Sequence, residues 1–296
     1  MVSKKQERFA SSGGKQNFIG ATQPHRAIFG KVMSAIAFAC AAIALIPLVA
    51  VLSYVTIKGL SRLNISAFTE LPPPPLVEGG GFGSAIVGTL IMVGIAALIS
   101  IPIGVLAAIY LTEFSRGKIA DAIRFATNVL SGVPSIIAGV FAYGVVVLTM
   151  GSFSAIAGGI ALSILMLPII VRTTDESLQL VSQDLRQAAV GIGATKFQTV
   201  VQVVLPVAIP AIVTGTTLAI ARAAGETAPL LFTALFTQFW PTSLTEPTPS
   251  LAVLVYNFAI VPFDNQQELA WAASLVLVML VLITSIISRL ATRKRF

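Results

Sequence analysis

The sequence predicts an all-α integral membrane protein with six transmembrane helices. Apolar residues make up 56% of the chain and charged residues only 10%, with a mean hydropathy of +0.91, which lies outside the range of soluble proteins. The charges are also absent from long stretches, and one helical crossing needs about 20 apolar residues. The charge-free stretches are residues 32–57, 79–112, 125–171, 197–221 and 269–288.

The third of these stretches is long enough for two crossings, and Thr149–Ser154 near its centre is typical of a turn. Two shorter apolar runs, 227–240 and 251–263, are interpreted as re-entrant or interfacial segments. The six predicted spans are 32–57, 84–111, 127–149, 154–172, 206–225 and 270–289.

The distribution of Lys and Arg predicts that both termini lie in the cytoplasm. With the N-terminus inside, 16 basic residues flank the inner ends of the spans, and only Lys58 and Arg62 lie outside. Basic residues near an anionic leaflet account for the net charge of +7. Nucleic-acid binding is therefore not expected.

The span positions divide the chain into a first helix and a core of five further spans. Residues 1–31 are predicted to form a polar cytoplasmic tail, 32–57 the first transmembrane helix and 58–83 an external linker. The core, 84–296, contains a cytoplasmic loop at 173–206 and an external region at 227–268. The lone Cys40 and His25 exclude a disulfide framework or a metal cluster.

The cytoplasmic loop shows a helix, turn, helix pattern. Ser182 is a candidate helix cap, Gly191 and Gly193 are candidate breaks, and Thr195 is a candidate second cap. Apolar residues recur at helical spacing on both sides: Leu185, Ala188, Ala189 and Ile192, then Phe197, Val200, Val201 and Val204. The small Ala188 and Ala189 would let a partner approach the backbone. Alternatively, the two helices lie on the bilayer surface or pack on the protein's own spans.

This loop resembles the cytoplasmic signature of ABC importer permeases, which reads EAA, three residues, Gly, nine residues, Ile, one residue, Leu-Pro. The matching residues are Gln187, Ala188, Ala189, Gly193, Val203, Leu205 and Pro206. Gln187 replaces the usual Glu, and Val203 the usual Ile. The resemblance implies that the loop docks on a separate dimeric ATPase subunit, which binds ATP and Mg²⁺. No phosphate-binding motif GxxxxGK[ST] occurs in the chain, so we expect no cofactor and no enzymatic activity of its own.

Two further segments are similar to the permeases of phosphate-specific ABC importers, A type. They are Ser131–Ile137 with Gly139, and Ala221–Pro229. The resemblance implies the type I ABC importer permease fold in the bacterial inner membrane. It also implies a homologous second permease as heterodimer partner, a periplasmic phosphate-binding protein outside, and contact with membrane lipid.

Arg222 and Glu226 are the candidate residues of the translocation pathway, with the adjacent Thr227. The two charges stand four residues apart at the end of an apolar stretch, so they are predicted to share a helix face. Charges in a span are costly unless they face protein or water. Arg222 would attract an anion, while Glu226 would orient the guanidinium. Alternatively, Arg222 only extends to the membrane surface beside a neutralising carboxylate.

Three other functions fit the same residues. An ion-coupled secondary transporter or channel would use Arg222 and Glu226 as its central site, although such proteins often show two related halves and no clear repeat is visible here. A permease for sulfate, molybdate or phosphonate would need a similar potential. A membrane scaffold would recruit a cytoplasmic partner through the loop without transporting anything.

Overall fold

Every regular element is helical in the computed structural model, which describes residues 24–115 and 117–293. Two compact units divide the chain, one up to Ser53 and one from Tyr54 onward. The elements are α1 (Pro24–Leu60), α2 (Ile65–Thr69), α3 (Gly83–Ile109), η1 (Tyr110–Phe114), α4 (Lys118–Ser131), α5 (Ser135–Ala142), η2 (Tyr143–Val147), α6 (Leu148–Met150), α7 (Ala155–Gln179), α8 (Gln183–Gly191), α9 (Lys196–Thr199), η3 (Val200–Val204), α10 (Leu205–Ala224), α11 (Ala228–Thr233), α12 (Leu251–Ala259) and α13 (Asp264–Arg293), where η marks a π-helix.

Within the described residues, five helices are long and apolar enough to cross a membrane, and a bent pair makes six if it counts as one span. This agrees with the predicted six spans. The five helices are Ile28–Leu60, Gly83–Phe114, Ala155–Gln179, Lys196–Ala224 and Asp264–Leu290, and the pair is Lys118–Ser131 with Ser135–Met150.

The third predicted span, 127–149, is divided between two helices, α4 and α5, in the structure. The chain bends by 101° between α4 and α5, at Gly132, Val133 and Pro134. Pro134 has no backbone N–H to continue a helix, and its ring disfavours the helical conformation at Val133. Pro134 instead takes the N-cap position of α5, with ψ 136°.

Several helices extend beyond their predicted ends. The first helix begins at Pro24 rather than Val32, so residues 24–31 of the predicted tail are helical, and residues 1–23 lie outside the described residues. The helix α7 also continues beyond its predicted end, to Gln179. A 2.9 Å ion pair between Arg172 and Glu176 supports this polar extension. The predicted loop 173–206 is therefore shorter than expected.

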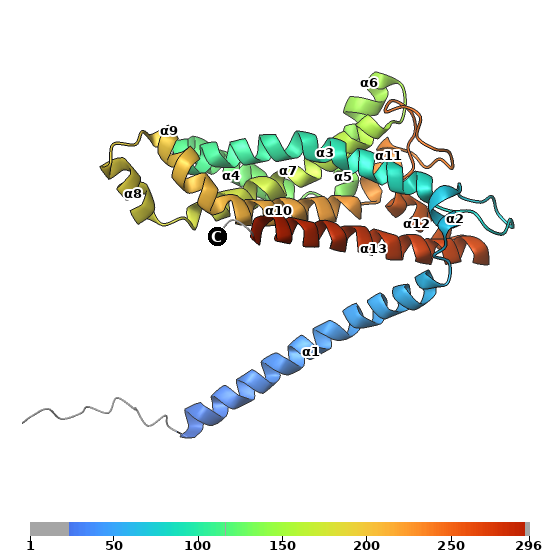
Figure 1. Cartoon of the computed structure of the whole chain (residues 1–296), viewed down its shortest axis with the longest axis horizontal. Helices are drawn as coiled ribbons and strands as arrows, with labels where there is room; N and C mark the ends of the chain where they lie inside the picture. Colours follow the sequence, from blue (N-terminus) through green and yellow to red (C-terminus); the bar gives the residue numbers. More distant parts are fainter. Residues whose placement is uncertain (1–23, 116, 294–296) are drawn as a thin grey trace, which may run out of the picture. The chain divides into compact units, whose positions relative to one another are not determined.

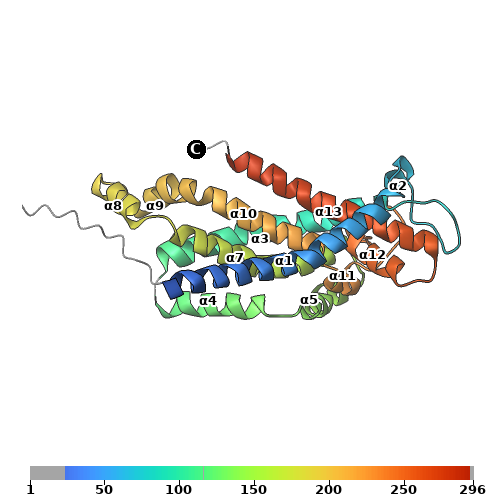
Figure 2. The same cartoon turned by 90° about the horizontal axis from the view of Figure 1, so that it is seen from below.

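Small residues bring α3 and α7 together along their lengths. Every fourth residue of α3 is buried: Gly88, Met92, Ala96, Ser100, Gly104 and Ala108. Such a face allows close helix packing in a membrane protein. The buried residues of α7 include Ala155, Leu162, Met166 and Ile170, which join Met92 and Ala96 in one apolar cluster. Figures 1 and 2 show α3, α7, α10 and α13 running side by side.

The segments at the end of this helical bundle farthest from α8 are short and tied together. α12 packs on α13 through a cluster that includes Leu254, Phe258 and Leu269. The buried Gln266 of α13 donates a hydrogen bond of 3.0 Å to the carbonyl of Pro73, which fixes the linker between α2 and α3. The re-entrant nature of 227–240 and 251–263 stays a prediction, although α11 and α12 are both too short for a crossing.

Candidate functional site

The helix, turn, helix pattern of the cytoplasmic loop is present in the structure. The Ser182 hydroxyl accepts a hydrogen bond from the N–H of Asp184 at the start of α8. Thr195 begins α9 with a complete capping box, which includes Gln198. Between them Gly193 adopts φ +91°, a conformation that favours glycine. The turn is therefore determined by residues close to it in the sequence, namely Ser182, Gly193 and Thr195.

The end of the pattern differs from the prediction, because Leu205 and Pro206 do not separate a short helix from a span. The helix continues from Lys196 to Ala224. Pro206 is accommodated because the preceding turn is a π-helix, in which the N–H of Leu205 bonds to the carbonyl of Val200. A wider turn relieves the clash between the proline ring and the carbonyl four residues before it.

The two halves of this loop are packed differently. Val200 and Val204 are buried, and Val204 clusters with Leu178 and Val181, with Leu205 packed against them. The second half therefore packs on the protein's own helices, as one of the sequence alternatives proposed. In the first half Ala189 is buried while Gln187 and Ala188 are exposed. Close approach of a partner is thus possible at Ala188 but not at Ala189.

Exposed apolar side chains occur on both sides of the turn along the chain. We call Leu185, Val190, Ile192 and Phe197 the loop-tip surface. Ile192 is 88% exposed, an unfavourable arrangement for an isolated protein. Beside it, Gln187 and Val190 help to line an open hollow of about 1110 Å³.

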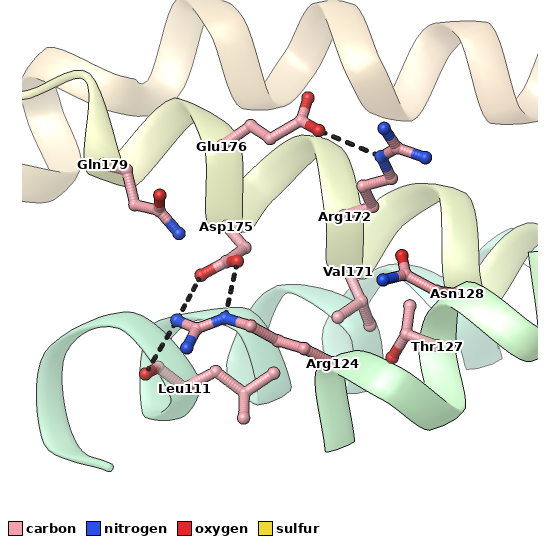
Figure 3. A pocket seen from close by; sticks show the side chains of 9 residues that line it. All are labelled: Leu111, Arg124, Thr127, Asn128, Val171, Arg172, Asp175, Glu176 and Gln179. Atoms are coloured by element: carbon pink, nitrogen blue, oxygen red, sulfur yellow. Dashed lines mark hydrogen bonds and ion pairs between the residues drawn. The ribbon is translucent and has the colours of Figure 1, made fainter. Parts of the chain in front are cut away.

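A polar network below the loop was not predicted. The Arg124 guanidinium donates to both carboxylate oxygens of Asp175, with Nε–Oδ2 3.0 Å and Nη2–Oδ1 3.1 Å. Thr112 donates to the same carboxylate at 2.6 Å. Figure 3 shows Arg124 reaching from α4 to Asp175 on α7, at one wall of a cavity of about 430 Å³. This network joins η1, α4 and α7.

A second ion pair missed by the sequence reading joins Arg186 of α8 to Glu113 of η1, with Nη2–Oε1 2.8 Å. In the sequence, Arg124 and Arg186 read only as residues that set the orientation in the membrane. Their acidic partners lie 51 and 73 residues away, a separation at which sequence spacing carries no signal.

Arg222 and Glu226 form an ion pair, with Nε–Oε1 3.6 Å. The prediction that they share one helix face is wrong, because α10 ends at Ala224, and Gly225 caps it. The Arg222 side chain is 59% exposed and that of Glu226 only 17%. Thr227, half-buried, occupies the N-cap position of α11 without a side-chain capping bond.

The two segments that resemble phosphate-specific permeases lie against each other. Gly139 of α5 packs on Pro229 of α11 so closely that a Cβ at Gly139 would stand 2.6 Å from the Pro229 Cα. The bend at Pro134 turns α5 toward α11. The helix α11 begins two residues after Glu226, the second member of the Arg222–Glu226 pair. The structure therefore places both segments in one region.

Comparison with known families supports the same interpretation. Residues 100–296 match the model of the binding-protein-dependent transport system inner membrane component. This chain belongs to that family of inner membrane permeases. The assignment favours an ATP-driven importer over an ion-coupled secondary transporter or a scaffold.

Individual relatives cover most of this permease. It is 43% identical over 239 residues to the phosphate transport system permease protein PstA of Yersinia pestis, covering 80% of this chain and 81% of the relative. The PstA protein of Haemophilus influenzae is 40% identical over 266 residues, covering 90% and 94%. PstA 1 of Mycobacterium tuberculosis is 36% identical over 279 residues, covering 91% and 92%.

Solved structures confirm the predicted permease fold. The MetNI methionine ABC transporter, in an inward-facing conformation, matches with a TM-score of 0.59 at 20% identity, covering 72% of this permease and 94% of that chain. A bacterial alginate ABC transporter, solved with its alginate pentasaccharide-bound periplasmic protein, matches with a TM-score of 0.64 at 15% identity, covering 89% and 94%. At these identities the likeness establishes the fold alone.

Proposed function

We propose that this permease is the A-type transmembrane subunit of an ATP-driven inorganic phosphate importer in the bacterial inner membrane. The assignment of phosphate as the substrate rests on the 43% identity to a phosphate transport system permease over 80% of the chain. A homologous second permease completes the pathway as a heterodimer. A phosphate-binding protein delivers the anion from the periplasm.

The energy enters through the loop around α8. A dimeric ATPase subunit holds ATP and Mg²⁺ and contacts the exposed Gln187 and Ala188 together with the loop-tip surface. Apolar side chains with this exposure are suited to burial against a protein partner. Gly193, Leu205 and Pro206 act indirectly, because they shape the turn and the helix that follows it.

Phosphate passes Arg222, Glu226 and Thr227 on its way through the membrane. The exposed Arg222 guanidinium can donate charge-assisted hydrogen bonds to an anion. The Glu226 carboxylate pairs with the same guanidinium and keeps it in place. Glu226 repels a fully ionised oxyanion, but it can accept a hydrogen bond from a protonated phosphate oxygen. This arrangement selects phosphate over sulfate, which carries no proton at neutral pH.

The proposal is tested with the complete transporter in proteoliposomes. We expect the double variant Arg222→Ala/Glu226→Ala to lose phosphate uptake by about tenfold or more, because a hydrogen bond to a charged group contributes roughly 1.5–3 kcal/mol. Uptake of labelled phosphate is measured with ATP inside, with sulfate as competitor.

A matched control is the double variant Arg172→Ala/Glu176→Ala. It removes another Arg–Glu pair of the same spacing from an exposed site, where both side chains are 60% exposed. We expect it to retain uptake. Normal uptake in the Arg222/Glu226 variant would show that the pair has no role in the pathway. Uptake that needs an ion gradient but no ATP would contradict the importer itself.

A further inference from the structure

Arg186 carries most of the polar attachment of α8 to the rest of the permease. One of its terminal nitrogens, Nη2, donates to Glu113 Oε1 at 2.8 Å and to the carbonyl of Leu178 at 2.8 Å. The other, Nη1, donates to the carbonyl of Val181. The side chains of Arg186 and Glu113 are only 14% and 9% exposed. One guanidinium therefore joins α8 to the ends of both α3 and α7.

The apolar attachment of α8 is slight by comparison. Ala189 is its single buried residue. An alanine side chain provides little packing surface, since roughly 0.8 kcal/mol is gained per buried CH₂ group. The position of α8 thus depends on the Arg186 contacts more than on packing.

Glu113 lies in η1, a π-helical turn that continues α3. The preceding residue, Thr112, donates to Asp175 at 2.6 Å, and Arg124 donates to the carbonyl of Leu111 at 3.3 Å. These bonds hold η1 to α7 and α4, while Glu113 holds it to α8. The turn η1 is therefore bonded to α7 and α4 as well as to α8. When α8 is displaced, η1 must move with it or one of these contacts must break.

We propose that Arg186 is the positioning residue that transmits displacement of α8 to α3 and α7. The inference rests on the proposed function, in which α8 contacts the ATPase. Arg186 precedes the Gln187–Pro206 signature and has no part in that motif. Its proposed action is through Glu113 and the two carbonyls, rather than on the transported anion. A planar, permanently charged guanidinium with five donors can hold three acceptors at fixed angles, which a lysine ammonium does less rigidly.

The test uses the reconstituted transporter with its ATPase, second permease and binding protein, and it measures phosphate transported per ATP hydrolysed. We expect Arg186→Gln to lower this ratio by about tenfold, within the range of allosteric coupling energies, while the ATPase still co-purifies. Glu113→Gln keeps the carbonyl contacts and should lower the ratio less. Arg172→Gln/Glu176→Gln, an exposed pair on α7, should leave it unchanged.

Two results would overturn the proposal. One is a wild-type ratio in both Arg186→Gln and Glu113→Gln. The other is a parallel loss of uptake, hydrolysis and ATPase co-purification in Arg186→Gln, which would assign Arg186 to docking or folding. If Arg186→Gln fails to insert, the proposal is tested with the double variant Glu113→Arg/Arg186→Glu, in which the two charges are exchanged. It should have a higher ratio than Glu113→Arg alone, and an equal or lower ratio overturns the proposal.

The same measurement separates this inference from the proposed function. A wild-type transporter without ATP-dependent phosphate uptake would remove the proposed function and the inference together. Normal wild-type uptake with an unchanged ratio in the Arg186 and Glu113 variants would remove only the inference.

Discussion

At the scale of single residues, Gly193 determines the turn between α8 and α9. Its φ of +91° costs a residue with a Cβ roughly 1–2 kcal/mol. A Cβ at Gly193 would meet no atom within 4 Å, so any effect of substitution comes from the backbone rather than from packing.

We therefore expect Gly193→Ala to shift the turn and reduce ATP-driven uptake without preventing insertion. Gly191→Ala is the matched control, because Gly191 ends α8, also has open space around it and has no positive φ. Alanine there should be neutral or slightly stabilising, since it favours the helix. Uptake and thermal unfolding of the purified variants are compared, and equal behaviour of the two would contradict the role of the backbone.

Residue-level predictions from the sequence succeeded where the cause is local. Ser182 and Thr195 cap the helices that follow them within three residues, and such contacts depend only on neighbouring positions. The Arg186–Glu113 pair forms across 73 residues. Its formation depends on how α3 and α7 end side by side, which the sequence pattern does not contain.

At the scale of elements, the contact between α5 and α11 limits what residue 139 can be. A Cβ at Gly139 would stand 2.6 Å from the backbone Cα of Pro229. Backbone cannot rotate away as a side chain does, so the two helices must separate.

We expect Gly139→Ala to destabilise the permease by roughly 1–3 kcal/mol, the usual cost of overpacking, and to reduce uptake by displacing α11. Gly144→Ala in η2 is the control, since a Cβ at Gly144 meets nothing within 4 Å. Thermal unfolding in detergent measures the first effect. A melting temperature equal to that of the Gly144 variant would show that α5 and α11 can move apart freely.

Element boundaries were predictable only where the chain changes from charged to apolar residues or back. Charge-free stretches located the five helices that are long enough to cross a membrane, because charge is expelled from the bilayer. They could not reveal the 101° bend between α4 and α5, which lies inside one apolar stretch. Nor could they reveal that the helix from Lys196 passes through Pro206, since this depends on the π-turn at Val200–Val204.

At the scale of the whole molecule, the distribution of positive charge predicts that α8 faces the cytoplasm. The turn between α11 and α12 is then expected to face the periplasm, because α10 lies between α8 and that turn. Figure 1 agrees, since α8 and α9 lie at one end of the helices and α11 and α12 at the other. Phe239 belongs to the second end, where it shares a hollow with Pro72 and Pro73.

The single cysteine makes this orientation directly measurable. In a Cys40→Ser background, we expect a membrane-impermeant thiol reagent to label Phe239→Cys in intact spheroplasts and Ile192→Cys only after permeabilisation. The two positions are a matched pair, because their residues are 72% and 88% exposed and differ chiefly in the side of the membrane. Labelling of Ile192→Cys in intact spheroplasts would place α8 outside. It would then separate the loop-tip surface from any cytoplasmic ATPase and remove the route by which Arg186 could transmit ATP-driven motion.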